Sequence, residues 1–488
     1  MASRIDDLSA NGTTSATIRI GDPGPRPAFP GPWALFADFR DEYRARRRGS
    51  FPRGENRPSI RTTWRFRHDV LNLLLESYER HGPIFGLRIV FGYNLAMIGP
   101  EANHFMLVSG RENFGWRHGR MGDLLTLIGD GLLTTDGDYH DGSRAILMPA
   151  FHRERIATAA ALMGSEAAAA VDALPAGAST DVYEWARTLA MRIAMGALFG
   201  FDPDSGRAAA IAARFESGLG FHAREFPMQM LFGPGTPLAK LKRDRAALEE
   251  MVGEEIARRR RRGEDGGDVL SSLLASTDAE GRSLSDRQVL DHVLTLLFAG
   301  HDTATSTVSF LVYELARNPD WADRLAAELR GVCGDREPGA EELFGGLPLL
   351  TRAVDETLRL YPPAWIGPRR SVRDFEFNGV TAPAGIPCFY SSWVSHRLPE
   401  VFADPHRFDP DRFLPERRAE WPRGAYVPFG MGPRVCIGKR FGYTEVHAIA
   451  AALVRRFRFE LPDGYELEIH QSPTLSPQGG LPVRLTPR

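Results

Sequence analysis

This sequence has few lysines, few cysteines and no long apolar run. The last two absences argue against a disulfide-stabilised protein and against a membrane span. Only three of the 60 basic residues are lysines, which we attribute to genome composition rather than to function. Three cysteines are too few and too scattered for a disulfide framework, so a reducing compartment is expected. No apolar run approaches the ~18 residues of a membrane span, and no basic segment followed by an apolar one opens the chain. We therefore expect a soluble, cytoplasmic protein with no transmembrane anchor.

The charge balance and the length set further bounds. A net charge of −2 gives no electrostatic case for a nucleic-acid partner. The 488 residues, 43% of them hydrophobic, can bury a large core, and no linker divides them. We expect a flexible Pro/Gly-rich lead over residues 1–32, then a single domain over 33–488, as a monomer. The arginine-rich runs 44–48 and 258–262 are expected to be solvated helix ends, although the first could also touch anionic lipid or a redox partner.

Periodicity predicts a mainly α (α+β) protein. Residues 86–99, 372–390 and 457–486 carry the alternation and the β-formers of short strands, whereas most of the rest has a helical period. The longest predicted helix runs from Ser285 to Ala316 and is stopped by Asn318-Pro319. At 1.5 Å per residue it would be roughly 45–50 Å long. The helix contains Gly300 and Thr303 near its middle, where propensity disfavours both, so another requirement must place them there.

The most specific motif is Phe-Gly-Met-Gly-Pro-Arg-Val-Cys-Ile-Gly over residues 429–438. A lone cysteine in a glycine-rich loop is ordinarily a buried, inert thiol. Here the spacing suits a thiolate that binds haem iron at Cys436. Gly430 and Gly438 would let the backbone approach the porphyrin and aim N–H groups at the sulfur, and Phe429 would keep water away. Thiolate ligation favours O–O cleavage more than a proximal His or Met does.

This F-x-x-G-x-R-x-C-x-G pattern near the C-terminus resembles the signature of the cytochrome P-450 family. The resemblance extends over most of the chain and implies a large helical domain with small β-sheets. Haem b, which is iron protoporphyrin IX, would lie between the long distal helix and the Cys436 loop. The implied reaction inserts one oxygen atom from O2 into a hydrophobic small molecule such as a terpenoid, fatty acid or steroid. Because only about 50 residues follow Gly438, electrons are expected from an external ferredoxin and its NAD(P)H-dependent reductase.

The resemblance also assigns roles on the long helix. Ala299 and Gly300 match the small residues that open a groove for dioxygen, and Asp302 and Thr303 match an acid–alcohol pair that delivers protons. Without the cysteine motif, a mid-helix Thr would instead be read as bonding back to a carbonyl. His301 is expected to be a packing residue rather than an iron ligand.

Cationic partners for the two haem propionates are expected at four positions. His140 and Arg144 stand at i, i+4 spacing in a stretch that resembles the family's W-x-x-x-R helix, with His140 in the Trp position. Arg369 and Arg434 match two further propionate-binding positions. The alternative at each position is an ordinary surface residue.

Two more groups complete the prediction. Glu356, Arg359 and Arg412 resemble the family's structural triad, so we expect scaffolding from them rather than catalysis. The expected lining of the substrate pocket includes Leu297, Ala299, Trp365, Ile366 and Leu475. Apolar residues between 215 and 232 suggest an adaptable lid, or else simply core.

Two rival functions stay open at this point. One is a haem-thiolate enzyme that uses peroxide or rearranges a peroxide substrate, although the intact Asp302-Thr303 pair counts against it. The other is a non-catalytic haem-binding sensor or carrier. Substrate-dependent NAD(P)H consumption would separate both from a monooxygenase.

Overall fold

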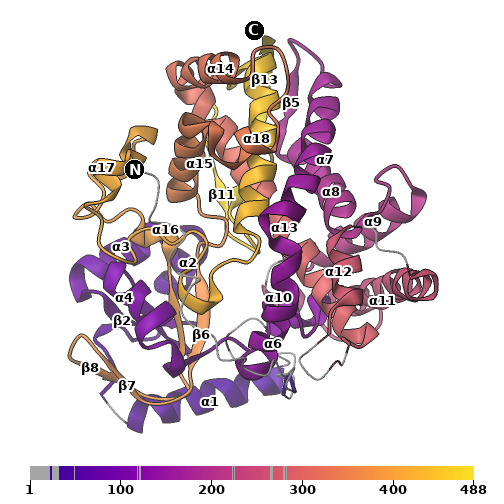
Figure 1. Cartoon of the computed structure of the whole chain (residues 1–488). Coiled ribbons are helices and arrows are strands. Elements are labelled where there is room, and N and C mark those ends of the chain that lie inside the picture. Colours follow the sequence, from indigo (N-terminus) through magenta and orange to yellow (C-terminus); the bar gives the residue numbers. More distant parts are fainter. Residues whose placement is uncertain are drawn as a thin grey trace.

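A helical body lies beside a mixed β-sheet, and the chain passes between these two parts several times (Figure 1). The computed structural model describes residues 22–24, 32–48, 50–117, 119, 122–222, 224, 226–263, 267–277, 281 and 283–488. Most of the predicted lead over 1–32 lies outside these residues. Among them, no helix combines the length and the hydrophobicity that a membrane span requires.

The largest sheet has six strands in the order β1-β2-β3-β9-β6-β4. They are β1 (Gly54–Glu55), β2 (Ile84–Ile89), β3 (Gly92–Met97), β9 (Pro387–Tyr390), β6 (Gly367–Ser371) and β4 (Phe114–Gly115). β2 and β3 form the antiparallel pair that the alternation over 86–99 predicts. β6 runs antiparallel to β9, which places Arg369 opposite Cys388. Every residue of β3 and β9 is buried, because helices and loops cover both faces at the centre of the sheet.

Three smaller sheets account for the other predicted strands. β7 (Phe375–Phe377) pairs with β8 (Val380–Ala382), and β11 (Ile469–His470) pairs with β12 (Ser476–Pro477). β13 (Pro482–Pro487) lies between β10 (Phe457–Glu460) and β5 (Ser179–Asp181). The strands predicted within 372–390 and 457–486 are confirmed. The two- and three-residue strands β1, β4 and β5 were not predicted, because such short segments carry no periodic signal.

The predicted long helix is α13 (Asp286–Arg317). The Ser285 side chain accepts a hydrogen bond from the Gln288 N–H, and the Gln288 side-chain oxygen accepts one from the Ser285 N–H, so the helix begins with a capping box. It ends at Asn318, and Pro319 begins α14 (Pro319–Cys333). Most of α13 is buried, because helices pack around it as the central element of the helical body (Figure 1).

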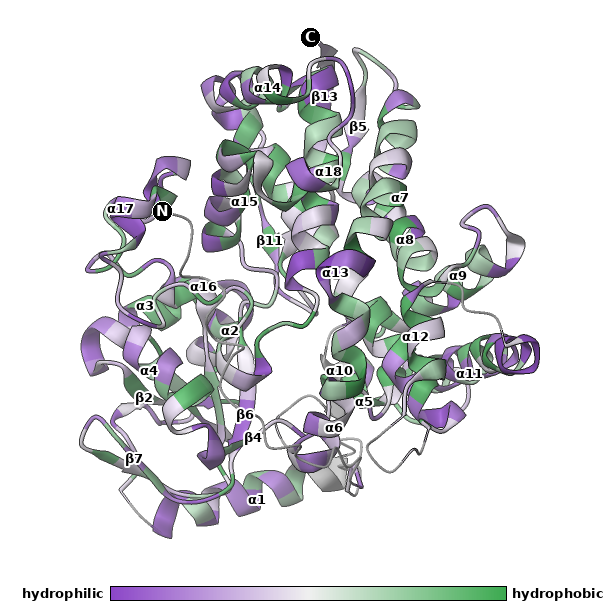
Figure 2. Ribbon diagram, in the orientation of Figure 1, coloured by the Kyte–Doolittle hydropathy of each residue, from purple (hydrophilic) through white to green (hydrophobic). Residues whose placement is uncertain are grey.

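The other α-helices surround α13 or flank the large sheet. Among the described residues they are α1 (Pro32–Arg48), α2 (Ile60–His68), α3 (Val70–His81), α4 (Pro100–His104), α5 (Gly122–Ile128), α6 (Gly137–Leu147), α7 (Arg153–Asp172), α8 (Val182–Phe199), α9 (Gly206–Leu219), α10 (Phe226–Gln229), α11 (Pro237–Arg262), α12 (Val269–Ala275), α15 (Pro348–Leu360), α16 (Ser392–Ser395), α17 (Pro415–Arg418) and α18 (Lys439–Arg456). α8 and α18 both pack against α13. Figure 2 shows hydrophilic residues along the outlying helices α1, α11 and α17.

One predicted surface segment is wrong in part. Within the arginine run 258–262 at the end of α11, Arg259 is only 5% exposed. Its guanidinium donates to Glu255, to Asp268 and to the carbonyl of Phe199. A run of five arginines does not reveal that one of them meets two buried carboxylates. Arg259 therefore ties α11 to α8 and α12.

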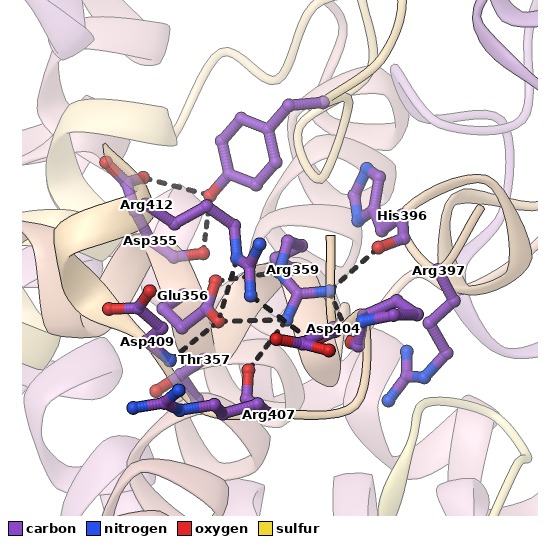
Figure 3. A network of polar contacts seen from close by, with 12 residues as sticks. Asp355, Glu356, Thr357, Arg359, His396, Arg397, Asp404, Arg407, Asp409 and Arg412 are labelled. Atoms are coloured by element: carbon purple, nitrogen blue, oxygen red, sulfur yellow. Dashed lines mark hydrogen bonds and ion pairs between the residues drawn. The ribbon is translucent and has the colours of Figure 1, made fainter. Parts of the chain in front are cut away.

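Glu356, Arg359 and Arg412 meet in one buried network (Figure 3). Arg359 donates from Nε and Nη2 to the two Glu356 carboxylate oxygens at 2.7 and 2.8 Å. Arg412 lies 3.4 Å from Glu356 Oε1, and the Asp409 N–H donates to the same oxygen at 2.9 Å. The remaining Arg359 donors reach backbone carbonyls of the 396–407 segment, so the network joins α15 to the chain that leads toward the cysteine loop.

Candidate functional site

The backbone of the cysteine loop is fixed by two local features. The Cys436 N–H donates to the Phe429 carbonyl at 2.9 Å, which closes the loop. Gly432 has φ +69°, and a Cβ there would lie 2.6 Å from the Leu107 carbonyl oxygen, so only glycine fits. α18 begins at Lys439, directly after Gly438. These constraints place Cys436 at the N-terminal end of a long buried helix.

The Cys436 side chain faces an internal space. Cys333 and Cys388 are buried, whereas the Cys436 side chain is exposed. Protein atoms nevertheless surround its thiol, and this enclosure raises its pKa, against the opposing effects of the Gly438 N–H and the Arg144 and Lys439 charges. The Cys436 thiol is therefore both solvent-accessible and closely surrounded by protein atoms. A bound cation would replace the lost solvation and hold the sulfur as thiolate.

A short stretch of α13 is also accessible. Between residues 289 and 315 of this helix, every side chain is buried except those of Ala299, Gly300 and Thr303. Positions i and i+4 lie on one face, so Ala299 and Thr303 open toward the same side. Small side chains in the middle of a buried helix, beside accessible surface, are what a flat ligand over that face requires.

Two of the predicted propionate partners, Arg369 and Arg144, form no ion pair with a carboxylate among the described residues. Arg369 is 2% exposed and has no ion pair in the described part of the chain; its guanidinium lies 3.3 Å from the Trp116 ring centroid and donates to the Pro368 carbonyl. Burial lowers the pKa of Arg369 to about 10, which leaves it charged at neutral pH. Burial also lowers the pKa of Arg144, which is half-buried, and the nearby Cys436 and Asp141 groups oppose that shift. A buried, unpaired guanidinium group such as that of Arg369 calls for an anion.

His140 lies one helical turn before Arg144 on α6. Its ring is 3% exposed, and its Nδ1 lies 2.8 Å from Asp141 Oδ1. Burial, with the Arg434 charge, lowers the pKa of His140. A neutral ring whose Nδ1–H donates to Asp141 leaves Nε2 as an acceptor, so His140 needs a second proton to donate to an anion from that side.

Arg434 already forms an ion pair with Asp136, which the sequence did not reveal. Its Nη2 donates to Asp136 Oδ1 at 2.7 Å and to the Thr135 carbonyl at 2.6 Å. Trp116 lies between the Arg434 and Arg369 guanidinium groups, 5.3 and 3.3 Å from its centroid. Asp136 also accepts from the Trp116 N–H. Within the described part of the chain, only Nη2 of Arg434 donates hydrogen bonds, so Nε and Nη1 could bind a further anion, although Asp136 already compensates part of the charge.

The side chains of Asp302 and Thr303 on α13 form hydrogen bonds with different partners. Thr303 Oγ1 donates to the Ala299 carbonyl at 2.7 Å, which is the back-bonded arrangement. Asp302 is buried and accepts from Thr474 Oγ1 at 2.8 Å. His301 is fully buried, its Nε2 lies 3.1 Å from the Arg187 carbonyl oxygen, and its Nδ1 lies 4.0 Å from Asp302. Burial lowers the pKa of His301 to about 4, so the ring is neutral at physiological pH.

The predicted pocket residues come together only in part. Trp365 and Leu475 are held by linked segments, because the Trp365 Nε1–H donates to the Gln471 carbonyl at 2.8 Å and the Leu475 N–H donates to the Pro363 carbonyl at 3.2 Å. Ile366 is half-buried beside Trp365. Leu297 is 1% exposed, and at 3.6 residues per turn it lies roughly 160° around α13 from Ala299. Leu296 lies on the Ala299 side instead.

The residues of the predicted lid over 215–232 also fall into a buried group and an exposed group. Phe215 and Phe221 are core residues, whereas Met228, Leu231 and Phe232 are exposed. The Phe226 side chain lies outside the described residues. Trp116, Asp136 and Thr474 were not singled out from sequence, because their contacts join segments far apart in the chain.

Together these residues fit a haem. The protein has an accessible thiol at Cys436, a buried guanidinium at Arg369 with no ion pair among the described residues, and a short accessible stretch of small residues on α13. A group with one iron and two carboxylates would satisfy both the sulfur and the cations.

Comparisons with known proteins also point to a haem protein. The family model for cytochrome P450 matches residues 52–482. The chain is 36% identical to cyclooctat-9-en-7-ol 5-monooxygenase of Streptomyces melanosporofaciens over 70% of this chain and 75% of that protein. It is 28% identical to pentalenene oxygenase of Streptomyces avermitilis over 88% and 96%. The solved structure of retinoic acid bound cyanobacterial CYP120A1 superimposes with a TM-score of 0.81 at 28% identity, covering 90% of this chain and 100% of that one.

The family implies a haem-thiolate cofactor, dioxygen, redox partners and a hydrophobic substrate, and the site just described has groups suited to the first of these. A match over residues 52–482, relatives named as oxygenases and a shared fold all point the same way. The chain belongs to the cytochrome P450 family and is a P450 monooxygenase.

Proposed function

We propose that the protein binds haem b through Cys436 and hydroxylates a terpenoid-like substrate with one oxygen atom of O2. The enclosed yet accessible Cys436 thiol is the observation that carries this proposal. When bound, the haem iron supplies oxygen activation with electrons delivered from outside. The protein's own residues bind, orient and protonate.

Arg144, Arg369 and Arg434 would hold the propionates, with His140 as a further donor when it carries two protons. Arg369 is the strongest candidate of the four, because it is buried, charged and unpaired by any carboxylate among the described residues. Arg434 would bind one propionate while it stays bonded to Asp136. The Gly438 N–H would help to hold the Cys436 sulfur as an anion.

Thr303 and Asp302 would deliver protons, and each must first change partner. Thr303 Oγ1 now donates to a helix carbonyl, and a rotation about χ1 would turn it toward the open side of α13. Asp302 now accepts from Thr474, and the second carboxylate oxygen lies toward His301. Water ordered between the two side chains would complete the relay.

The substrate class rests on the relatives and on the pocket wall. Cyclooctat-9-en-7-ol 5-monooxygenase and pentalenene oxygenase are named for polycyclic terpenoid substrates. Trp365 and Leu475 are apolar side chains that protein atoms cover, Ile366 is half-buried, and in the proposed pocket they would form an apolar wall for a hydrocarbon skeleton. An external ferredoxin with its NAD(P)H-dependent reductase would supply the electrons.

Absorption spectroscopy tests whether the Cys436 thiolate binds the haem iron. Reduced protein under carbon monoxide should absorb at about 450 nm, and Cys436→His should shift the band to about 420 nm while haem stays bound. A wild-type maximum at about 420 nm in undamaged protein contradicts the assignment. Substrate-dependent NAD(P)H consumption with surrogate redox partners then tests monooxygenase turnover against peroxide-driven chemistry and against a non-catalytic haem protein.

A further inference from the structure

Large apolar side chains are exposed together on three neighbouring elements far along the chain from the Cys436 loop. We define the α1–α2 patch as the exposed Phe36 and Tyr43 and the half-buried Phe39 of α1, Ile60 and Trp64 of α2, and Val90 and Phe91 of the β2–β3 turn. Ile60 is 92% exposed and Phe91 is 60% exposed. A soluble surface seldom gathers several such side chains without a partner.

Contacts show that the patch is continuous. The Phe39 and Phe91 rings lie 6.0 Å apart, which joins α1 to the turn. The Val90 N–H donates to Thr63 Oγ1 at 2.9 Å, which joins the turn to α2. Ile60 and Trp64 are one helical turn apart and therefore share a face of α2. α1 lies at one edge of the molecule, so one side of it is open to an extended partner (Figure 1).

The β2–β3 turn holds the exposed apolar side chain of Val90 on a strained backbone. Val90 has φ +55° and is 43% exposed. A β-branched residue in the left-handed region is unfavourable, and glycine or asparagine would be relaxed there. Solvent alone gives no reason to keep valine and phenylalanine at the tip of this turn.

Arginines surround the apolar side chains. Residues 36–68 contain ten arginines and four acidic residues, although the whole chain has a net charge of −2. Arg44, Arg47 and Arg48 are exposed on α1, and Arg61 is exposed on α2. The patch is therefore both apolar and locally basic.

We propose that the α1–α2 patch binds the surface of an anionic phospholipid bilayer. Phe, Trp and Ile side chains enter the headgroup boundary, while arginines bind lipid phosphates and keep their charges in water. A second copy of this chain is a poorer occupant, because two copies meeting here would bring two basic surfaces together. A bilayer also dissolves apolar compounds, so the association would bring the enzyme to the phase that holds a hydrophobic substrate.

Vesicle flotation of the full-length haem-loaded protein tests the proposal. Vesicles of phosphatidylcholine and phosphatidylglycerol at about 7:3 should capture the protein, and pure phosphatidylcholine vesicles should capture it at least about fivefold more weakly. Salt at about 0.5 M should release most of the protein bound to the anionic vesicles.

Variants locate the surface. Ile60→Glu with Phe91→Glu should weaken capture on the order of tenfold or more, and Arg48→Gln with Arg61→Gln by about fivefold or more. Val332→Glu with Val372→Glu is the matched control, because these valines are 43% and 52% exposed outside the patch, and it should leave capture unchanged. The absorption spectrum of each variant confirms that the haem site is intact.

Four outcomes overturn the proposal. They are no capture by anionic vesicles, equal capture by neutral vesicles, equal losses in the patch and control variants, and a dimer that the patch variants dissolve in the absence of vesicle binding. Because these measurements need neither turnover nor thiolate ligation, they can fail while the proposed haem function holds, and the reverse is also possible.

Discussion

Removal of the Glu356 carboxylate should destabilise the protein strongly. Arg359 and Glu356 are both 0% exposed, and the carboxylate accepts two charge-assisted hydrogen bonds from the guanidinium (Figure 3). In Glu356→Ala the Arg359 charge keeps its carbonyl partners but loses its buried counter-charge. The Asp409 N–H and Arg412 lose their shared acceptor as well. Breaking one partner of a buried pair costs about 3–5 kcal/mol, a large part of the typical 5–15 kcal/mol of folding stability.

Urea denaturation at neutral pH measures this loss. Unfolding is followed by far-UV circular dichroism and by haem absorbance, because a chain of this size need not unfold in two states and the two probes reveal an intermediate. The matched control is Arg80→Ala. Arg80 also contacts two carboxylates, Glu55 at 2.9 Å and Glu76 at 3.2 Å, but its side chain is 52% exposed. Its removal should cost about 0–1 kcal/mol.

The conservative variant separates charge from shape. Glu356→Gln keeps the volume and one acceptor oxygen but removes the negative charge, so its loss of stability should lie between those of Glu356→Ala and Arg80→Ala. If Glu356→Ala costs no more than the surface control, Arg359 is hydrated in the folded protein and the network is not a scaffold.

Three further outcomes follow from the site and its surroundings. Thr474→Val removes the hydroxyl that holds Asp302, so product formed per NAD(P)H should fall about tenfold while Thr474→Ser retains it, measured by product analysis against cofactor consumption. Arg369→Gln removes a buried cation, so haem should pass to an excess of apo-globin at least about tenfold faster, and an unchanged rate contradicts propionate binding. Arg258 hydrogen bonding lowers the pKa of Glu255 from 4.5 to about 2, against the effect of burial. Its stabilisation is therefore present above pH about 4.5 and is lost as the pH falls toward 2, and the unfolding free energies of wild type and Glu255→Gln should converge over that range.

Features set by local sequence were predictable. The ends of α13 follow from a capping serine and a stopping proline, and these signals act within one turn of the residues that carry them. The strands over 84–97 follow from alternation. The cysteine loop is also local, because its glycines and the closing Cys436-to-Phe429 bond lie within ten residues.

Features set by packing were not predictable. Arg259 and Arg48 each belong to an arginine run at a helix C-terminus, yet the first is 5% exposed and the second is an exposed surface residue. The difference arises because Asp268 and the Phe199 carbonyl converge on Arg259 from other elements. The ion pair between Arg434 and Asp136 likewise joins residues almost 300 positions apart, and no pattern in a single sequence predicts it.

The positions of Asp302 and Thr303 show how two residues that are adjacent in a motif can have different surroundings in the fold. Asp302 and Thr303 are adjacent in sequence, so successive positions on a helix point roughly 100° apart. Thr303 lies on the accessible face, whereas Asp302 lies in the core and is held by Thr474, 172 residues away. The segment that carries Thr474 also carries Leu475, whose neighbour across the chain is Pro363. Any movement of Leu475 would therefore also move the adjacent Thr474 hydroxyl, which donates to Asp302, the acid that we propose delivers protons.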